Sequence, residues 1–147
     1  MSYITNSDIE QRLGTSSYIQ LTDDEGTGSA NEARVDEARL GAEGEANSYL
    51  ARRYAVPVDL SAHAELQAVL KSFVLDLAEY RLHARRPPIP SDVVRRREQA
   101  VTWLRRVAAG QVHLPAETPV DENPAIGQIG QVTGQKRLFD RDELRGL

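Results

Sequence analysis

Residues 61–84 constrain the fold most, because they are the longest stretch in which apolar side chains recur at helical spacing. The apolar stripe is broad, which predicts a central helix that contacts more than one neighbour. A proline-rich connector at residues 85–90 ends this helix, since proline lacks the backbone N–H that a helix needs. The stripe consists of Leu66, Val69, Leu70, Phe73, Val74, Leu77 and Tyr80.

The N-terminal region contains signals for a shorter helix. Thr5 and Asp8 have the spacing of a capping box, with Asp in place of the usual Glu. The predicted helix ends at Leu13, because Gly14 favours the backbone conformation that follows a helix. A small apolar cluster at residues 18–21 predicts one further helical turn.

Two longer helices are predicted on either side of the central one. Asn31 can cap a helix that runs to about Tyr54, and its small residues would allow another helix to approach closely. Ser91 can cap the last helix, which ends at Gly110. Their predicted buried faces are Val35, Ala38, Ala42, Ala46, Tyr49 and Arg53 in the first, and Val94, Val101, Leu104 and Ala108 in the second.

The fold class expected from these signals is all-α, a small helical bundle followed by a long extended C-terminal arm. The helical body covers residues 1–110 and the arm covers residues 111–147, where prolines interrupt any helix. Apolar residues at 126–132 could also form a short β-ribbon. Because Phe139 lies between two leucines near the end of the arm, we expect this segment to dock on a neighbouring subunit or a partner.

Composition excludes several classes of function. The chain has 147 residues and no cysteine, which removes disulfides, thiolate metal sites and cysteine nucleophiles. The net charge of −4 argues against a dedicated nucleic-acid binder, and no apolar run approaches the ~18 residues of a membrane span. We therefore expect a soluble protein with no membrane partner.

The net charge conceals an uneven distribution along the chain. Residues 1–50 carry 10 acids and 3 bases, net −7, whereas residues 51–110 carry 6 acids and 11 bases, net +5. Residues 111–147 carry 6 acids and 4 bases, net −2. Such segregation suits self-association or docking on a partner, as well as simple solvation.

No pattern of catalytic residues is found, so we expect no enzyme activity, no metal and no cofactor. His63, His83 and His113 are isolated, and neither a HExxH nor a CxxC motif occurs. Asp76 and Glu79 could act as an acid–base pair. We favour a structural role in which one of them pairs with Arg97 or Arg81 inside the bundle.

The basic cluster on the last helix leaves a second function open, that of a small helical DNA-binding or regulatory protein. Arg95, Arg96 and Arg97 are consecutive, so they spread over roughly 200° of the helix and do not form one stripe. Stacking on single-stranded nucleic acid would also need interleaved aromatic residues, which are missing here.

Several stretches, taken in order, resemble the head–tail joining proteins of tailed bacteriophages, in the branch seen in Mu-like phages. The resemblance covers nearly the whole chain and is weakest at residues 115–135. The matching stretches are Tyr3-Ile4-Thr5 with Leu13-Gly14, Ile19 to Asp23, Tyr49 to Tyr54 with Pro57, Tyr80-Arg81-Leu82, Ala100 to Gly110, and Arg137 to Asp142.

This resemblance implies a structural adaptor of the virion neck, assembled in the cytoplasm of a bacterial host. Its partners would be the portal protein, neighbouring copies in a ring that is usually dodecameric, and a downstream neck or tail-completion protein. DNA would pass through the ring channel without sequence-specific binding. By analogy the docking arm would use Arg137, Leu138, Phe139, Arg141 and Leu144. Contacts between helices or subunits would use Arg52, Arg53, Tyr54, Arg97 and Trp103. For the last two the helical spacing itself is the reason, since it places Trp103 at an interface or groove and Arg97 toward the apolar face, where it needs a counter-charge.

Overall fold

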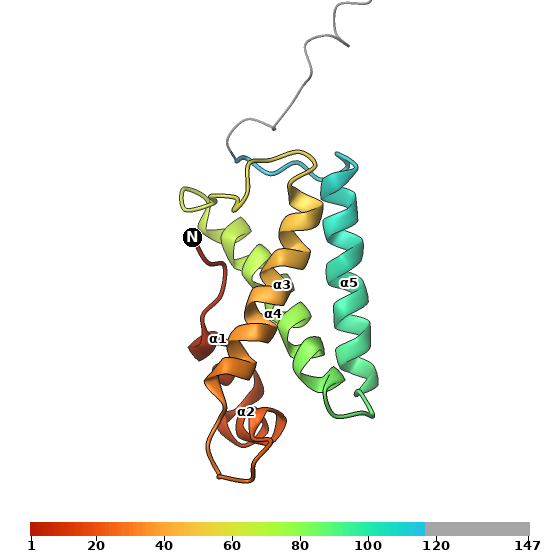
Figure 1. The fold of residues 1–147 in the computed structure, drawn as a ribbon. Helices are drawn as coiled ribbons and strands as arrows, with labels where there is room; N and C mark the ends of the chain where they lie inside the picture. Colours follow the sequence, from red (N-terminus) through yellow and green to blue (C-terminus); the bar gives the residue numbers. More distant parts are fainter. Residues whose placement is uncertain (117–147) are drawn as a thin grey trace, which may run out of the picture.

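The computed structural model describes residues 1–116, which form five α-helices and no β-strand (Figure 1). The predicted all-α bundle is therefore confirmed. Most of the predicted arm, including the proposed ribbon at residues 126–132, lies outside the described residues. The helices are α1 Asn6–Leu13, α2 Thr15–Thr22, α3 Glu32–Leu50, α4 Ala64–Ala84 and α5 Ser91–Ala108.

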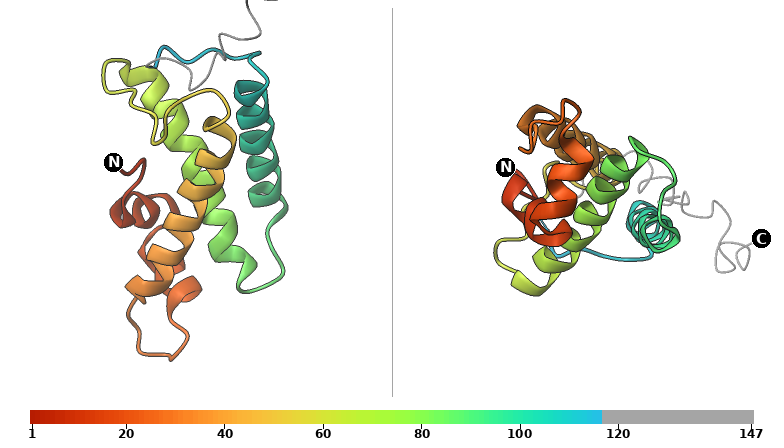
Figure 2. Two further views of the ribbon diagram at one scale, coloured as in Figure 1. Left: turned by 45° about the horizontal axis from the view of Figure 1, so that its top comes forward. Right: turned by 90° about the horizontal axis from the view of Figure 1, so that it is seen from below.

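Helix α4 is the centre of the bundle and contacts each of the other four helices. Figure 2 shows it between α1 on one side and α5 on the other. Leu70, Val74, Leu77 and Leu82 are almost completely buried along its length, as expected for a helix covered on several sides. The predicted central position of this segment is confirmed.

The N-terminal helices begin and end at the residues that carry the local signals. The Thr5 hydroxyl accepts a hydrogen bond from the Asp8 amide, and the Asp8 carboxylate accepts one from the Thr5 amide at 2.8 Å. Gly14 has a φ of +80°, a value that few other residues tolerate, and it joins α1 to α2. The prediction of one turn after Gly14 was too short, because α2 continues over 8 residues.

Three predicted helix ends were wrong. Helix α3 is capped by Asn31 but ends at Leu50, and the chain then turns so that Tyr54 enters the core. The central helix begins at Ala64 rather than Ser61, after a turn. Pro90, not Ser91, occupies the N-cap of α5, so the Ser91 side chain makes no capping bond.

The buried face of α5 is rotated slightly from the prediction, because Val93 is buried while Val94 is only partly so. Beyond the helix, Leu114 is fully buried and its amide donates to the Tyr54 hydroxyl at 2.9 Å. The core therefore continues at least to Leu114. No helix within the described part of the chain is both long and apolar enough to cross a membrane.

Candidate interaction surfaces

Two acidic side chains of α4 are buried in the bundle and are held by arginines from two other helices. The two terminal nitrogens of Arg96, on α5, each donate a hydrogen bond to the Glu79 carboxylate, at 2.8 and 2.9 Å. Arg12 of α1 pairs with Asp76 and lies 3.4 Å from Glu79 through its Nε atom. Burial raises the pKa of Asp76, although the two arginines oppose that shift. This network ties α1, α4 and α5 together.

The arginines that hold these carboxylates are not the ones that the sequence predicted. Arg81 and Arg97 instead share one carboxylate of α3, that of Glu45, with an N–O distance of 2.9 Å in each case. The preferred pairing of Asp76 or Glu79 with Arg97 or Arg81 was therefore wrong. Both arginines lie on the side of their helices that faces α3, whereas Asp76 and Glu79 face α1 and α5.

Aspartates at or near the surface make the stability of the fold depend on pH in the acid range. Hydrogen bonds from Arg85 lower the pKa of Asp24, and Asn6 and Arg39 do the same for Asp36. Stability from such groups is present above their ordinary pKa of 3.8 and is lost as the pH falls through the lower folded values. Asp76 has the opposite effect on stability, because its raised pKa favours the folded state as the pH falls. More aspartates have a lowered pKa than a raised one. Those with a lowered pKa are Asp8, Asp23, Asp24, Asp36 and Asp59.

We therefore expect the free energy of unfolding, measured with urea at several pH values, to fall as the pH decreases below about 3.8. Asp24→Asn should make this decline shallower, because Asp24 binds three arginines, Arg34, Arg85 and Arg86. Glu25→Gln is the matched control, since Glu25 is an exposed neighbour with no ion pair in residues 1–116. Stability that stays constant down to pH values well below 3.8 would contradict this account.

Two aromatic side chains meet at the surface formed by α4 and α5. Phe73 and Trp103 have ring centroids 4.9 Å apart, and both are only partly buried. They line an open groove of about 470 Å³. The other residues that line this groove are Arg95, Glu98, Gln99, Thr102 and Arg106. The sequence placed Trp103 at an interface or groove, and the structure puts it in a groove.

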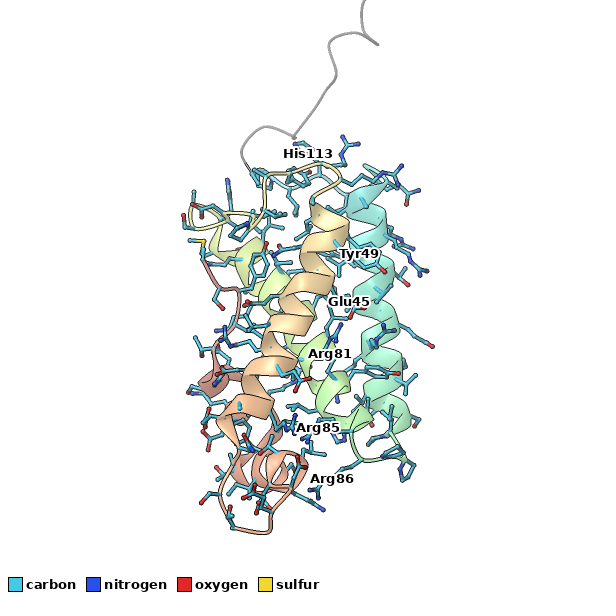
Figure 3. The ribbon with its side chains drawn as sticks, in the orientation of Figure 1. Glu45, Tyr49, Arg81, Arg85, Arg86 and His113 are labelled. Carbon is cyan, nitrogen blue, oxygen red and sulfur yellow. The ribbon has the colours of Figure 1, made fainter. Side chains whose placement is uncertain are left out.

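The residues after α3 lie against the segment that follows α5. Tyr54 is buried, and its ring lies 6.4 Å from that of His113, which is labelled at the end of the bundle in Figure 3. The Arg53 guanidinium packs against Gly110, where a Cβ atom would lie only 2.5 Å from it. Arg52 is exposed. Arg53 and Tyr54 therefore make contacts within one chain.

The basic cluster at residues 95–97 is divided among three surroundings. Arg95 lines the aromatic groove, Arg96 binds Glu79, and Arg97 binds Glu45 while stacking over the Tyr80 ring at 4.7 Å. The expected spread around the helix is confirmed. Two of the three charges are committed to the bundle, which weakens the DNA-binding alternative.

Sequence reasoning missed several residues that organise these surfaces. Glu45 was overlooked because it lies at the edge of the small-residue face of α3, where charged side chains are usually solvated. No local sequence pattern marks Arg12 or Arg96 as part of a buried ion pair, since the buried residues they bind are distant in the sequence. The predicted docking residues Arg137, Leu138, Phe139, Arg141 and Leu144 lie outside the described part of the chain. Within residues 1–116, no cluster of side chains suitable for a metal ion is present.

The sequence matches the family described as Bacteriophage Mu, Gp36, over residues 3–131. The chain belongs to this phage Mu family. The match covers all five helices and indicates a role in the structure or assembly of a bacteriophage. No curated protein matches the sequence.

Proposed function

We propose that the protein is a structural adaptor of the phage neck. In this proposal, copies form a ring beneath the portal, extend the DNA channel and provide a platform for a downstream neck or tail-completion protein. The ring would be dodecameric, and the protein would be assembled in the host cytoplasm and reside at the head–tail interface of the virion. The adaptor acts by binding and has neither catalytic activity nor a cofactor.

The match to the phage Mu family over residues 3–131 is the observation that carries this proposal. The geometry of the bundle supports it, because α4 and the ion pairs around Asp76 and Glu79 make a cross-braced body. A ring subunit needs such a body, since it must keep its shape while it contacts neighbours on two sides.

The aromatic groove around Trp103 is the surface that we assign to a neighbouring copy. Partly exposed aromatic side chains flanked by arginines are typical of the residues that dominate protein interfaces. Phe73 and Trp103 supply the apolar area, while Arg95 and Arg106 line the groove beside them. The acidic first third of the chain, net −7 over residues 1–50, is complementary in charge to these arginines.

DNA would pass through the ring without being held. The described structure supports this view, because Arg96 and Arg97 are bound to carboxylates and do not join Arg95 in a basic stripe. Acidic residues facing a channel would repel phosphate and let DNA slide. This assignment makes a net charge of −4 compatible with a protein that surrounds DNA.

Deleting residues 137–147 is expected to abolish attachment to the portal, because Phe139 and the arginines Arg137 and Arg141 would no longer reach their sites. The measurement is cosedimentation of the chain with assembled portal. The thermal unfolding curve should be unchanged, since the deletion leaves in place every core residue described within residues 1–116. Deleting only residues 145–147 is the matched control and should keep attachment. Attachment that persists after the longer deletion would overturn the role of the arm.

A further inference from the structure

A second, more basic cleft opens between α3 and α5, with α4 as its floor. Figure 3 shows Glu45, Arg81 and Arg85 in this space. The cleft has a volume of about 360 Å³ and lies on a different part of the surface from the aromatic groove, with which it shares no residue. It is lined by Arg34, Glu37, Ala38, Glu45, Tyr80, Arg81, Ala84, Arg85 and Arg97.

The positive charge of this cleft exceeds the negative charge available to it in the described chain. Glu45 is shared by two arginines, each of which binds one of its oxygens at 2.9 Å. Asp24 is likewise shared by Arg34 and Arg85 beside the cleft. Four arginines therefore face three carboxylates, those of Glu45, Asp24 and Glu37.

A glycine in the middle of α3, Gly41, leaves the space that the Arg81 guanidinium occupies in the cleft. A Cβ atom at Gly41 would lie 2.9 Å from the Arg81 Nη1 atom, so a larger residue there would displace the guanidinium. Glycine lowers the stability of a helix by about 1 kcal/mol relative to alanine. The close approach of Arg81 gives a physical reason for a glycine at this position. The Arg81 Nε atom is buried and has no hydrogen-bond partner in residues 1–116.

The cleft also offers apolar surface next to these donors. The Tyr80 ring lies under the Arg97 guanidinium, and Ala38 and Ala84 line the cleft from α3 and α4. Arg97 and Arg81 each form one hydrogen bond to Glu45, although a guanidinium has five N–H donors. A second carboxylate could therefore bind here without displacing the first.

We propose that this cleft binds an acidic segment of a partner protein, with a carboxylate on Arg81 and Arg97 and a neighbouring apolar side chain on Tyr80. This inference goes beyond the adaptor function and does not depend on it. A protein segment fits better than nucleic acid, because Glu37 and Glu45 line the cleft and would repel a continuous phosphate backbone. The carboxylates of a peptide are separated by neutral residues and can avoid them, and Glu45 itself shows that the two arginines accept one.

The test is a titration of the full chain with the synthetic peptide acetyl-Asp-Leu-Glu-Phe-Asp-amide, followed by NMR. We expect the largest shift changes at Ala38, Gly41 and Tyr80, and binding that weakens with added salt. Arg97→Gln should weaken binding by about tenfold, since a hydrogen bond between charged groups is lost. Arg105→Gln is the matched control on the same helix, because Arg105 is exposed and lies outside the cleft.

Gly41→Ala provides a second variant that should fold at least as well as the native chain, because alanine favours the helix. The new methyl group would push the Arg81 guanidinium out of position, so we expect binding to weaken severalfold. The proposal is overturned if the peptide causes no shift changes in the cleft or if Arg105→Gln weakens binding as much as Arg97→Gln. Tighter binding of a short DNA duplex at the same residues would also overturn it.

Discussion

Leu77→Ala is expected to lower the free energy of unfolding by about 3–4 kcal/mol, as judged from other large-to-small changes in protein cores. Leu77 is completely buried in α4, the helix that contacts all four others. The substitution removes apolar contacts and leaves a cavity that the surrounding helices cannot fill without moving. Urea unfolding followed by circular dichroism measures the change.

Val69→Ala is the matched control for Leu77→Ala, because it removes apolar atoms from the same helix at a site that is 39% exposed. We expect it to cost less than about 1 kcal/mol, since little apolar surface is returned to water and alanine favours the helix. Equal losses for the two variants would contradict the central position of Leu77 in the core.

Glu79→Ala is expected to cost about 2–3 kcal/mol, because removal of one partner leaves a partly buried arginine without its main counter-charge. Arg96 would lose its two hydrogen bonds to Glu79 and keep the exposed Asp92 at 3.1 Å. Asp76 would be the one buried carboxylate left between Arg12 and Arg96. The same urea experiment applies. The effect should be largely insensitive to salt, since the carboxylate is only 7% exposed.

The control for Glu79→Ala is Glu98→Ala on α5. Glu98 is exposed, and it forms no ion pair within the described residues, so its removal should change stability by less than about 0.5 kcal/mol. A loss for Glu79→Ala as small as that for Glu98→Ala would show that the buried ion pairs contribute little to the stability of the bundle.

The helices could be predicted because their signals are local. The Thr5–Asp8 capping box, the Asn31 cap and the apolar stripe of residues 61–84 each depend on residues a few positions apart. The end of α3 at Leu50 could not be predicted in the same way. It depends on Tyr54 reaching the core and binding the Leu114 amide, 60 residues further along the chain.

The charged contacts were harder to predict than the helices. Arg97 was expected to need a counter-charge, and it has one, but the partner is Glu45 rather than Asp76 or Glu79. The choice depends on the rotation of α3 and α5 about their axes, which a pattern within one helix does not determine. The cleft was missed for the same reason, because its arginines come from three helices and meet only in the folded chain.

In the proposed function, this member of the phage Mu family is an adaptor that assembles on the portal. Electron microscopy of the full chain mixed with the portal protein of the same phage tests this proposal most directly. The adaptor account predicts a ring of copies coaxial with the portal channel, with neighbouring copies in contact through the groove around Phe73 and Trp103. A chain that remains a free monomer, with the portal undecorated at saturating concentration, would contradict it.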